Sequence, residues 1–129
     1  MIRLATEADI MRIVDMVEDL RAAVGGPVPV NRPWTAMTVA RLVDSDDGFV
    51  AVSDGGFIAG SLQPTIINPN RVAMEQCWFS TDRSGVALLR AFEAWAHDRG
   101  AEMIQLSTGI NGPDLARLGY RAVEKAWIK

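Results

Sequence analysis

Hydrophobic residues recur at helical spacing near the start of the chain. The apolar positions lie three or four residues apart: Ile10, Ile13, Val14, Val17, Leu20 and Val24. Thr6 precedes this stripe as an expected N-cap, and Gly25 follows it as a stop signal. The pattern predicts an amphipathic helix from about residue 6 to 24, after a short strand at residues 2–5.

Alternating patterns in the middle of the chain predict three consecutive strands. Apolar runs at residues 48–53 and 57–63 flank Asp54-Gly55-Gly56, which is typical of an antiparallel hairpin. Residues 71–79 also alternate and predict a strand. One face is expected to carry Val72, Met74, Gln76 and Trp78, and the other Ala73, Glu75, Cys77 and Phe79. The Pro- and Gly-rich residues 25–33 predict a loop, with a short helix after it from about 35 to 44.

The second half of the chain predicts a helix, a strand, a short helix and a final strand. Leu88, Leu89, Phe92 and Trp95 form the apolar face of a helix over residues 85–99. Residues 102–107 are expected to form a strand, residues 111–113 open a short helix, and residues 121–128 alternate as a last strand. This order indicates an α/β fold with a mixed sheet and helices on both of its faces.

Composition narrows the function classes. The 129 residues fit one domain, and the net charge of −3 argues against a general binder of nucleic-acid phosphates. With one cysteine, Cys77, and one histidine, His97, the chain predicts neither an internal disulfide nor a Cys/His zinc site, and we expect no metal. No membrane-spanning run or signal peptide is evident, so the cytoplasm is the expected compartment and no membrane partner is expected.

The loop before the helix at residue 85 is the first candidate for binding chemistry. Its letters STDRSGVA end in Gly85, Val86 and Ala87 at the predicted start of the helix. Exposed N–H groups at a helix start can bind an anion, and Gly85 lets a ligand approach the backbone closely. Ser84 is a candidate cap and Arg83 a candidate phosphate contact. Composition alone leaves two readings open, a structural turn and a phosphate site.

Three stretches together resemble the GNAT superfamily of acyl-CoA-dependent N-acetyltransferases. MIRLATEADIMRIVDMV is similar to its first strand and helix. CWFSTDRSGVALLRAFEAWAHDRGAEMIQLST is similar to its central strand, pyrophosphate loop, helix and next strand. LARLGYRAVEKAWIK is similar to its closing segment. The resemblance implies one GNAT-like domain over residues 1–129, with a mixed, mostly antiparallel sheet of six or seven strands and a V-shaped cleft.

The same resemblance implies acetyl-CoA as co-substrate and a set of residues to bind it. The backbone of Trp78 and Phe79 would bind the pantetheine, and the loop from Arg83 through Ser84, Gly85 and Val86 to Ala87 would hold the pyrophosphate. Asn111 matches a polar position that contacts the cofactor. The loop is shorter and poorer in glycine than the family pattern, and Asp82 or Arg83 falls at the family's Arg/Gln position, depending on the register.

The implied reaction is direct transfer of an acetyl group to a primary amine. Glu75 is the candidate general base, against the alternative of a solvated strand residue. Leu115 stands where the family has a tyrosine acid, and Tyr120 occupies the closing aromatic position. The sequence does not specify whether the acceptor amine is a small molecule or a protein. A homodimer is possible for this chain. The alternative function is a catalytically degenerate GNAT-fold module that binds CoA or a protein.

Overall fold

The computed structural model describes residues 1–129 and contains five strands and three α-helices. Two short 3₁₀ helices, η1 and η2, complete it. The elements in chain order are β1 (Arg3–Leu4), η1 (Glu7–Asp9), α1 (Ile10–Val24), α2 (Arg32–Asp44), β2 (Gly48–Val52), β3 (Gly56–Gln63), β4 (Val72–Ser80), α3 (Gly85–Asp98), β5 (Met103–Gln105) and η2 (Ala116–Leu118).

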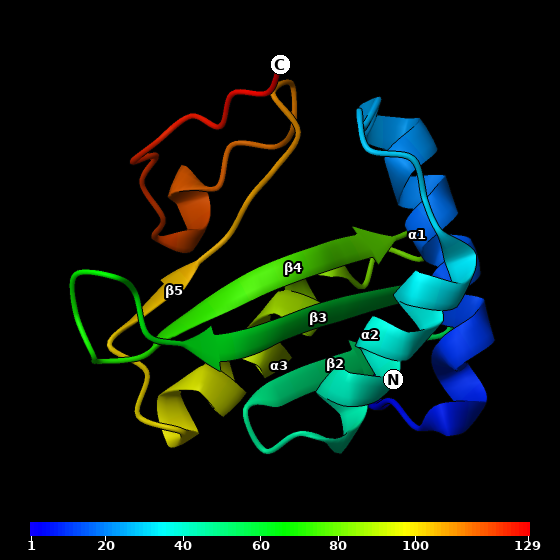
Figure 1. The fold of residues 1–129 in the computed structure, drawn as a ribbon, viewed down its shortest axis with the longest axis horizontal. Helices are drawn as coiled ribbons and strands as arrows, with labels where there is room; N and C mark the ends of the chain where they lie inside the picture. The colour runs from blue at the N-terminus through cyan, green and yellow to red at the C-terminus, as the bar shows by residue number, and fades with distance from the viewer.

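The strands form one sheet in the order β1-β2-β3-β4-β5, antiparallel except for the parallel pair β4 and β5. Figure 1 shows α1 and α2 on one face of this sheet and α3 on the other. The mixed, mostly antiparallel sheet with helices on both faces is therefore confirmed. The expected count of six or seven strands is wrong, because the sheet has five.

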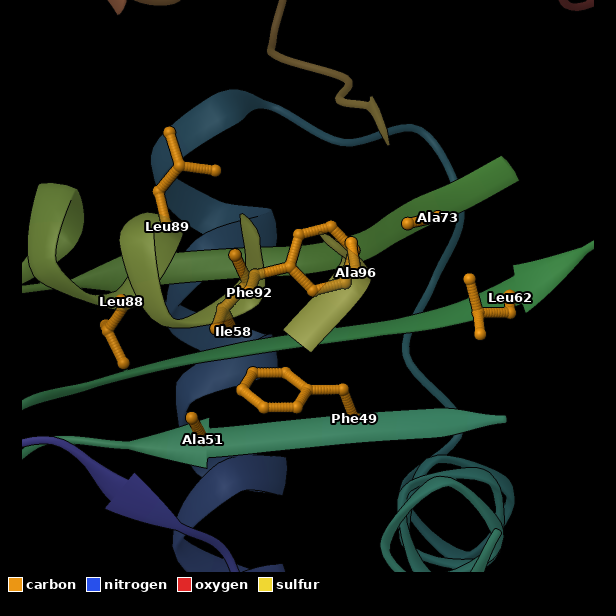
Figure 2. Packing of buried hydrophobic residues seen from close by; sticks show 9 residues of the cluster. All are labelled: Phe49, Ala51, Ile58, Leu62, Ala73, Leu88, Leu89, Phe92 and Ala96. Carbon is orange, nitrogen blue, oxygen red and sulfur yellow. The ribbon is translucent and has the colours of Figure 1, made fainter. Parts of the chain in front are cut away.

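Each face of the sheet has its own hydrophobic core. On the α3 face, Leu88, Leu89 and Phe92 are fully buried against strand residues such as Ile58, as Figure 2 shows. Phe92 and Phe49 lie with their ring centroids 5.9 Å apart. On the opposite face, Ile13 of α1 and Val39 of α2 pack on β2 and β3, in a cluster that consists of Ala5, Ile13, Met16, Val39, Val50, Val52, Phe57 and Ala59. Strands β3 and β4 are therefore packed between α3 on one face and α1 and α2 on the other.

Strand β4 contains a β-bulge that the sequence pattern did not indicate. Ala59 pairs with Cys77 but the next residue, Gly60, pairs with Glu75, so Gln76 is the extra residue. An extra residue shifts the alternation of side chains by one position. Trp78 therefore packs toward the α3 core and Cys77 toward the α1 and α2 core. The predicted faces of β4 are correct before Gln76 and reversed after it.

Residues 121–128 do not form the predicted last strand. The segment forms no regular element; Glu124 lies 3.5 Å from Gln105 of β5, but no ladder joins the two chains. Trp127 in this segment is 86% exposed. Strand β5 is only three residues long. Its edge is therefore too short to pair with the alternating residues 121–128. Tyr120 anchors the segment instead, through its hydroxyl and Glu93 at 2.6 Å.

Helix α2 begins three residues earlier than predicted. The Asn31 side chain accepts a hydrogen bond from the Trp34 amide at 2.9 Å and caps the helix. Pro33 is tolerated in the first turn because the N–H groups there have no partner within the helix. No helix is both long and apolar enough to span a bilayer.

Candidate functional site

The candidate site begins where β4 and β5 part. The two strands pair only over Val72–Met74 and Met103–Gln105, while β4 continues to Ser80. Beyond Met74, the edge of β4 that faced β5 has no neighbouring strand, and Figure 1 shows the two chains diverging there. An unpaired strand edge presents N–H and C=O groups that can bind an extended ligand.

Glu75 lies at this parting point. Its partner in β3 is Gly60, where a Cβ would touch Phe92 at 2.5 Å, so the Glu75 side chain is on the α3 face. The Ser107 amide donates to the Glu75 carboxylate at 3.0 Å across the gap between the strands. Burial raises the pKa of Glu75 to about 7, although the Ser107 hydrogen bond works against this. The carboxylate is half-buried and has one hydrogen-bond partner in the protein.

Trp78 and Phe79 have different backbone environments. Thr81 donates its N–H to the Gly55 carbonyl oxygen at 2.8 Å, on the β3 side of the strand. Backbone groups alternate in direction along a strand, so those of Phe79 also face β3 and those of Trp78 face the free edge. The Trp78 indole donates to the Gly85 carbonyl oxygen at 3.0 Å and joins the strand to the start of α3.

The first turn of α3 offers free donors next to this edge. The first intrahelical bond of α3 runs from the Leu88 amide to the Ser84 carbonyl at 2.9 Å. The amides of Gly85, Val86 and Ala87 precede it and have no partner in the helix. A Cβ at Gly85 would meet no atom closer than 3.4 Å, so packing does not demand glycine there. The side chains of Ser80 and Trp78 lie next to this glycine, within 4 Å of where a Cβ would be.

The loop itself is held by a carboxylate. One oxygen of Asp82 accepts from the amide and the hydroxyl of Ser84, and the other accepts from the Gly55 amide at 2.8 Å. The Ser84 hydroxyl bond, above all, holds the pKa of Asp82 well below its usual range. Ser84 occupies the N-cap position, but its hydroxyl does not cap the helix because it binds Asp82 and Ser53 instead.

Arg83 is the one non-glycine residue with a left-handed backbone, at φ 64°. This conformation costs a residue with a Cβ roughly 1–2 kcal/mol. The neighbouring hydrogen bonds of Asp82 and Ser84 fix the turn and hold Arg83 in it.

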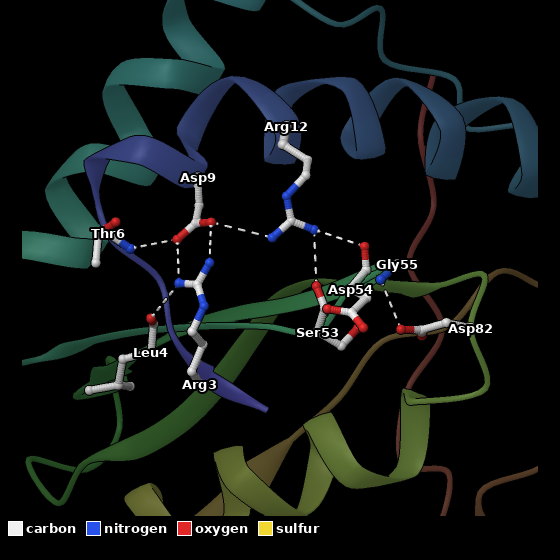
Figure 3. Close-up of polar contacts among 9 residues, drawn as sticks. All are labelled: Arg3, Leu4, Thr6, Asp9, Arg12, Ser53, Asp54, Gly55 and Asp82. Atoms are coloured by element: carbon white, nitrogen blue, oxygen red, sulfur yellow. Dashed lines mark hydrogen bonds and ion pairs between the residues drawn. The ribbon is translucent and has the colours of Figure 1, made fainter. Parts of the chain in front are cut away.

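Helix α1 reaches the same loop through the β2–β3 turn, as Figure 3 shows. Arg12 donates to the Ser53 carbonyl at 2.9 Å and the Asp54 carbonyl at 3.2 Å, and Gly55 in turn contacts Asp82. Asp9, whose side chain is 6% exposed, accepts from Arg12 on one side. Its other partner, Arg3, donates two bonds of 2.8 Å. These contacts form a continuous polar chain from the N-terminal strand to the loop.

Several members of this chain were not among the sequence candidates. Arg12 and Ser53 lie 41 positions apart, and nothing in the local pattern joins them. Asp82 carried a usable signal, because an aspartate two residues before a serine is typical of a side chain that accepts from the amide two positions on.

The other residues considered in the sequence analysis, Asn111, Tyr120 and Cys77, lie outside the loop before α3. Asn111 is exposed in a turn closed by Gly112 and Gly109 at 2.8 Å, so the structure does not join it to the loop before α3. Tyr120 packs against the α3 core, as its closing position implied. Burial and the bond to Glu93 raise the pKa of its phenol. Burial also raises the pKa of Cys77 to about 11, which keeps the thiol protonated and poorly nucleophilic.

Comparisons with known proteins place the fold. No protein-family model and no curated protein matches the sequence. Solved structures do match. A predicted acetyltransferase with acetyl-CoA from Clostridium acetobutylicum is 16% identical, with a TM-score of 0.77 over 100% of this chain and 94% of that one.

Two further structures cover the whole chain. A transcriptional regulator from Bacillus halodurans C-125 is 20% identical, with a TM-score of 0.78 and 97% of its own chain covered. A ribosomal-protein-alanine N-acetyltransferase from Brucella melitensis biovar Abortus 2308 is 12% identical, with a TM-score of 0.67 and 98% covered. At these identities the likeness concerns the fold. The chain has the fold of GNAT-type acetyltransferases, which its sequence also resembles.

Proposed function

We propose that this chain, as one domain, is an N-acetyltransferase that moves an acetyl group from acetyl-CoA to a primary amine by direct attack. The observation that carries the proposal is the position of Glu75. A partly buried carboxylate with a pKa of about 7 lies where β4 loses its neighbour, and a helix start with free amides lies at the end of the same strand. General bases work best with a pKa near the working pH.

The residues present fit acetyl-CoA. The Gly85, Val86 and Ala87 amides and the Arg83 side chain would hold the pyrophosphate, and the free backbone edge at Trp78 would bind the pantetheine. The Asp82 carboxylate is already bound to Gly55 and Ser84, so its charge is directed into the turn. We assign Phe79 and Asn111 no direct contact, since one pairs with β3 and the other lies in a separate turn.

Acetyl-CoA supplies an activated thioester, and the protein must place an amine beside it. Glu75 accepts a proton from the attacking amine, directly or through a water molecule. A backbone N–H on the free edge of β4 donates to the carbonyl oxygen as its charge grows. The amine nitrogen bonds to the carbonyl carbon, the carbon–sulfur bond breaks, and the thiolate leaves and takes a proton from water. Leu115 cannot donate that proton, and a thiolate is a good enough leaving group without one.

The test is release of free CoA thiol from acetyl-CoA in the presence of primary amines. We expect Glu75→Gln to lower kcat/KM by at least about 100-fold, since general bases contribute roughly 10²–10⁴-fold. The wild-type rate should rise with pH through about 7 as Glu75 loses its proton. Glu7→Gln, at an exposed residue of η1, is the matched control. A Glu75→Gln variant with wild-type rate and pH profile would remove Glu75 from the mechanism.

A further inference from the structure

A cavity of about 160 Å³ lies on the α1 and α2 face of the sheet, away from the cofactor residues assigned above. It is lined by Val17, Thr35, Thr38, Val39, Leu42, Phe57, Ala59, Gln76 and Cys77. Val39, Phe57 and Ala59 are buried and form its floor, while Gln76 is exposed and marks its mouth. An apolar cavity of roughly 150 Å³ is large enough for a benzene molecule.

The lining of this cavity is uncharged. The Thr35 hydroxyl donates to the Asn31 carbonyl at 2.8 Å and the Thr38 hydroxyl to the Thr35 carbonyl at 3.0 Å. Both hydroxyls are thus satisfied by their own helix. Cys77 keeps its proton, because burial raises the pKa of the thiol to about 11. No carboxylate lines the cavity, so an ammonium group inside it would have no counter-charge and would lose its hydration.

The mouth of the cavity adjoins the β4 bulge, one residue along the chain from Glu75. Gln76 is the extra residue of the β4 bulge and follows Glu75 directly in the chain. Its amide nitrogen donates to the Ser61 hydroxyl at 2.8 Å, which leaves the amide oxygen as an acceptor at the entrance. Glu75 faces α3 and Gln76 faces α2, so the bulge lies between the base and the cavity.

We propose that this cavity binds an uncharged apolar group of the acceptor, of about five or six carbons, and selects an amine with such a group over a diamine. The assignment rests on the proposed acetyl transfer for the role of acceptor, but the cavity can be tested without it. The occupant follows from the cavity itself, since its volume, its apolar floor and the absence of a counter-charge all favour a short hydrocarbon group.

The first arm of the test measures binding to the protein without acetyl-CoA. n-Pentylamine and 1,4-diaminobutane have the same number of heavy atoms and differ by a methyl group in place of a second amine. By calorimetric titration, we expect n-pentylamine to bind at least about tenfold more tightly. Thr38→Leu puts a larger, apolar side chain into the cavity from α2 and should abolish this preference. Ala36→Leu enlarges a side chain of α2 that does not line the cavity and should preserve it.

The second arm measures turnover of the two amines, and acetyl-CoA affinity is titrated separately. We expect Thr38→Leu to raise KM for n-pentylamine at least about fivefold and to leave the acetyl-CoA affinity unchanged. Val39→Ala enlarges the floor and should shift the preference toward a longer alkylamine. Equal binding of both amines, or a preference that survives Thr38→Leu, would overturn the assignment. Tight n-pentylamine binding without any acetyl-CoA binding would support the cavity and reject the proposed function.

Discussion

The guanidinium of Arg12 donates to the carbonyl oxygen of Ser53 at 2.9 Å and so ties helix α1 to the β2–β3 turn. The Ser53 hydroxyl contacts the Ser84 hydroxyl at 2.7 Å, and Gly55 of the same turn contacts Asp82. The loop that would hold the pyrophosphate is therefore supported from a helix on the opposite face of the sheet. A binding loop supported in this way is ordered before its ligand arrives, which lowers the entropic cost of binding.

Arg12→Ala should weaken acetyl-CoA binding without removing any group that touches the ligand. The loss of the bonds to the turn should raise the Kd by about 3–10-fold, equivalent to about one net hydrogen bond, and change kcat little. Arg41→Ala is the control, because Arg41 is exposed and its hydrogen bond to Met37 and its cation–π contact with Trp34 stay within α2. An unchanged Kd in Arg12→Ala would show that the loop does not depend on α1.

Asp9→Asn should destabilise the fold in a pH-dependent manner. The hydrogen bonds from Arg3, above all, hold the pKa of Asp9 far below its usual range. A lowered carboxyl pKa gives stability that is complete above the unfolded value of about 4 and is lost as the pH falls through the folded value. We expect Asp9→Asn to lower the free energy of unfolding by about 2 kcal/mol at pH 7. Urea denaturation at several pH values measures it, and a deficit that did not shrink below about pH 4 would contradict the assignment.

Glu75→Gln should have opposite effects on stability and activity. Because burial raises the pKa of Glu75 to about 7, the folded protein binds this proton more tightly than the unfolded chain does. The wild type therefore loses stability as the pH rises from about 4.5 through 7, and the neutral amide does not. At pH 8 we expect the variant to be more stable by about 2–3 kcal/mol while acetyl transfer is lost. Equal melting curves at pH 8 would mean that the carboxylate is solvated.

Arg83→Gly and Arg83→Ala separate backbone strain from charge. Glycine adopts the left-handed conformation of this position freely, so Arg83→Gly should stabilise the fold by about 0.5–1 kcal/mol. Alanine retains the strain and should not stabilise it. Both variants remove the cation, and both should weaken acetyl-CoA binding by about tenfold. If only one of the two lowered the affinity, the effect would come from loop shape and not from charge.

Much of the fold could be predicted from the sequence, because local patterns dictate it. The stripes of α1 and α3 and the Asp54-Gly55 turn lie within windows of a few residues, and the structure confirms them. The bulge at Gln76 has no such signal. It depends on how β4 registers against β3, and one extra residue reverses every later side chain. The final strand was wrong for the same reason, since its alternation needs an edge that the short β5 does not offer.

Some residues of the candidate site could likewise be predicted from the sequence, and others could not. The start of α3 could be chosen from the chain alone, because a glycine before a helix is a local feature, whereas Glu75 was chosen through the resemblance to GNAT enzymes. The support from Arg12 could not, since it crosses 41 positions of sequence. The raised pKa of Glu75 comes from burial, and its hydrogen bond from Ser107, 32 positions along the chain, depends on the tertiary fold as well.

The most direct test of the central claim is calorimetric titration of acetyl-CoA into the wild type and three variants at Gly85. Gly85→Ala should retain wild-type affinity, because a Cβ there meets nothing closer than 3.4 Å. Gly85→Gln and Gly85→Glu have side chains of equal size, and only the second adds a negative charge at the free amides. We predict micromolar binding in the wild type and a clearly larger loss in Gly85→Glu than in Gly85→Gln. No binding to the wild type at millimolar acetyl-CoA, or equal affinity in those two variants, would contradict a pyrophosphate site at the start of α3.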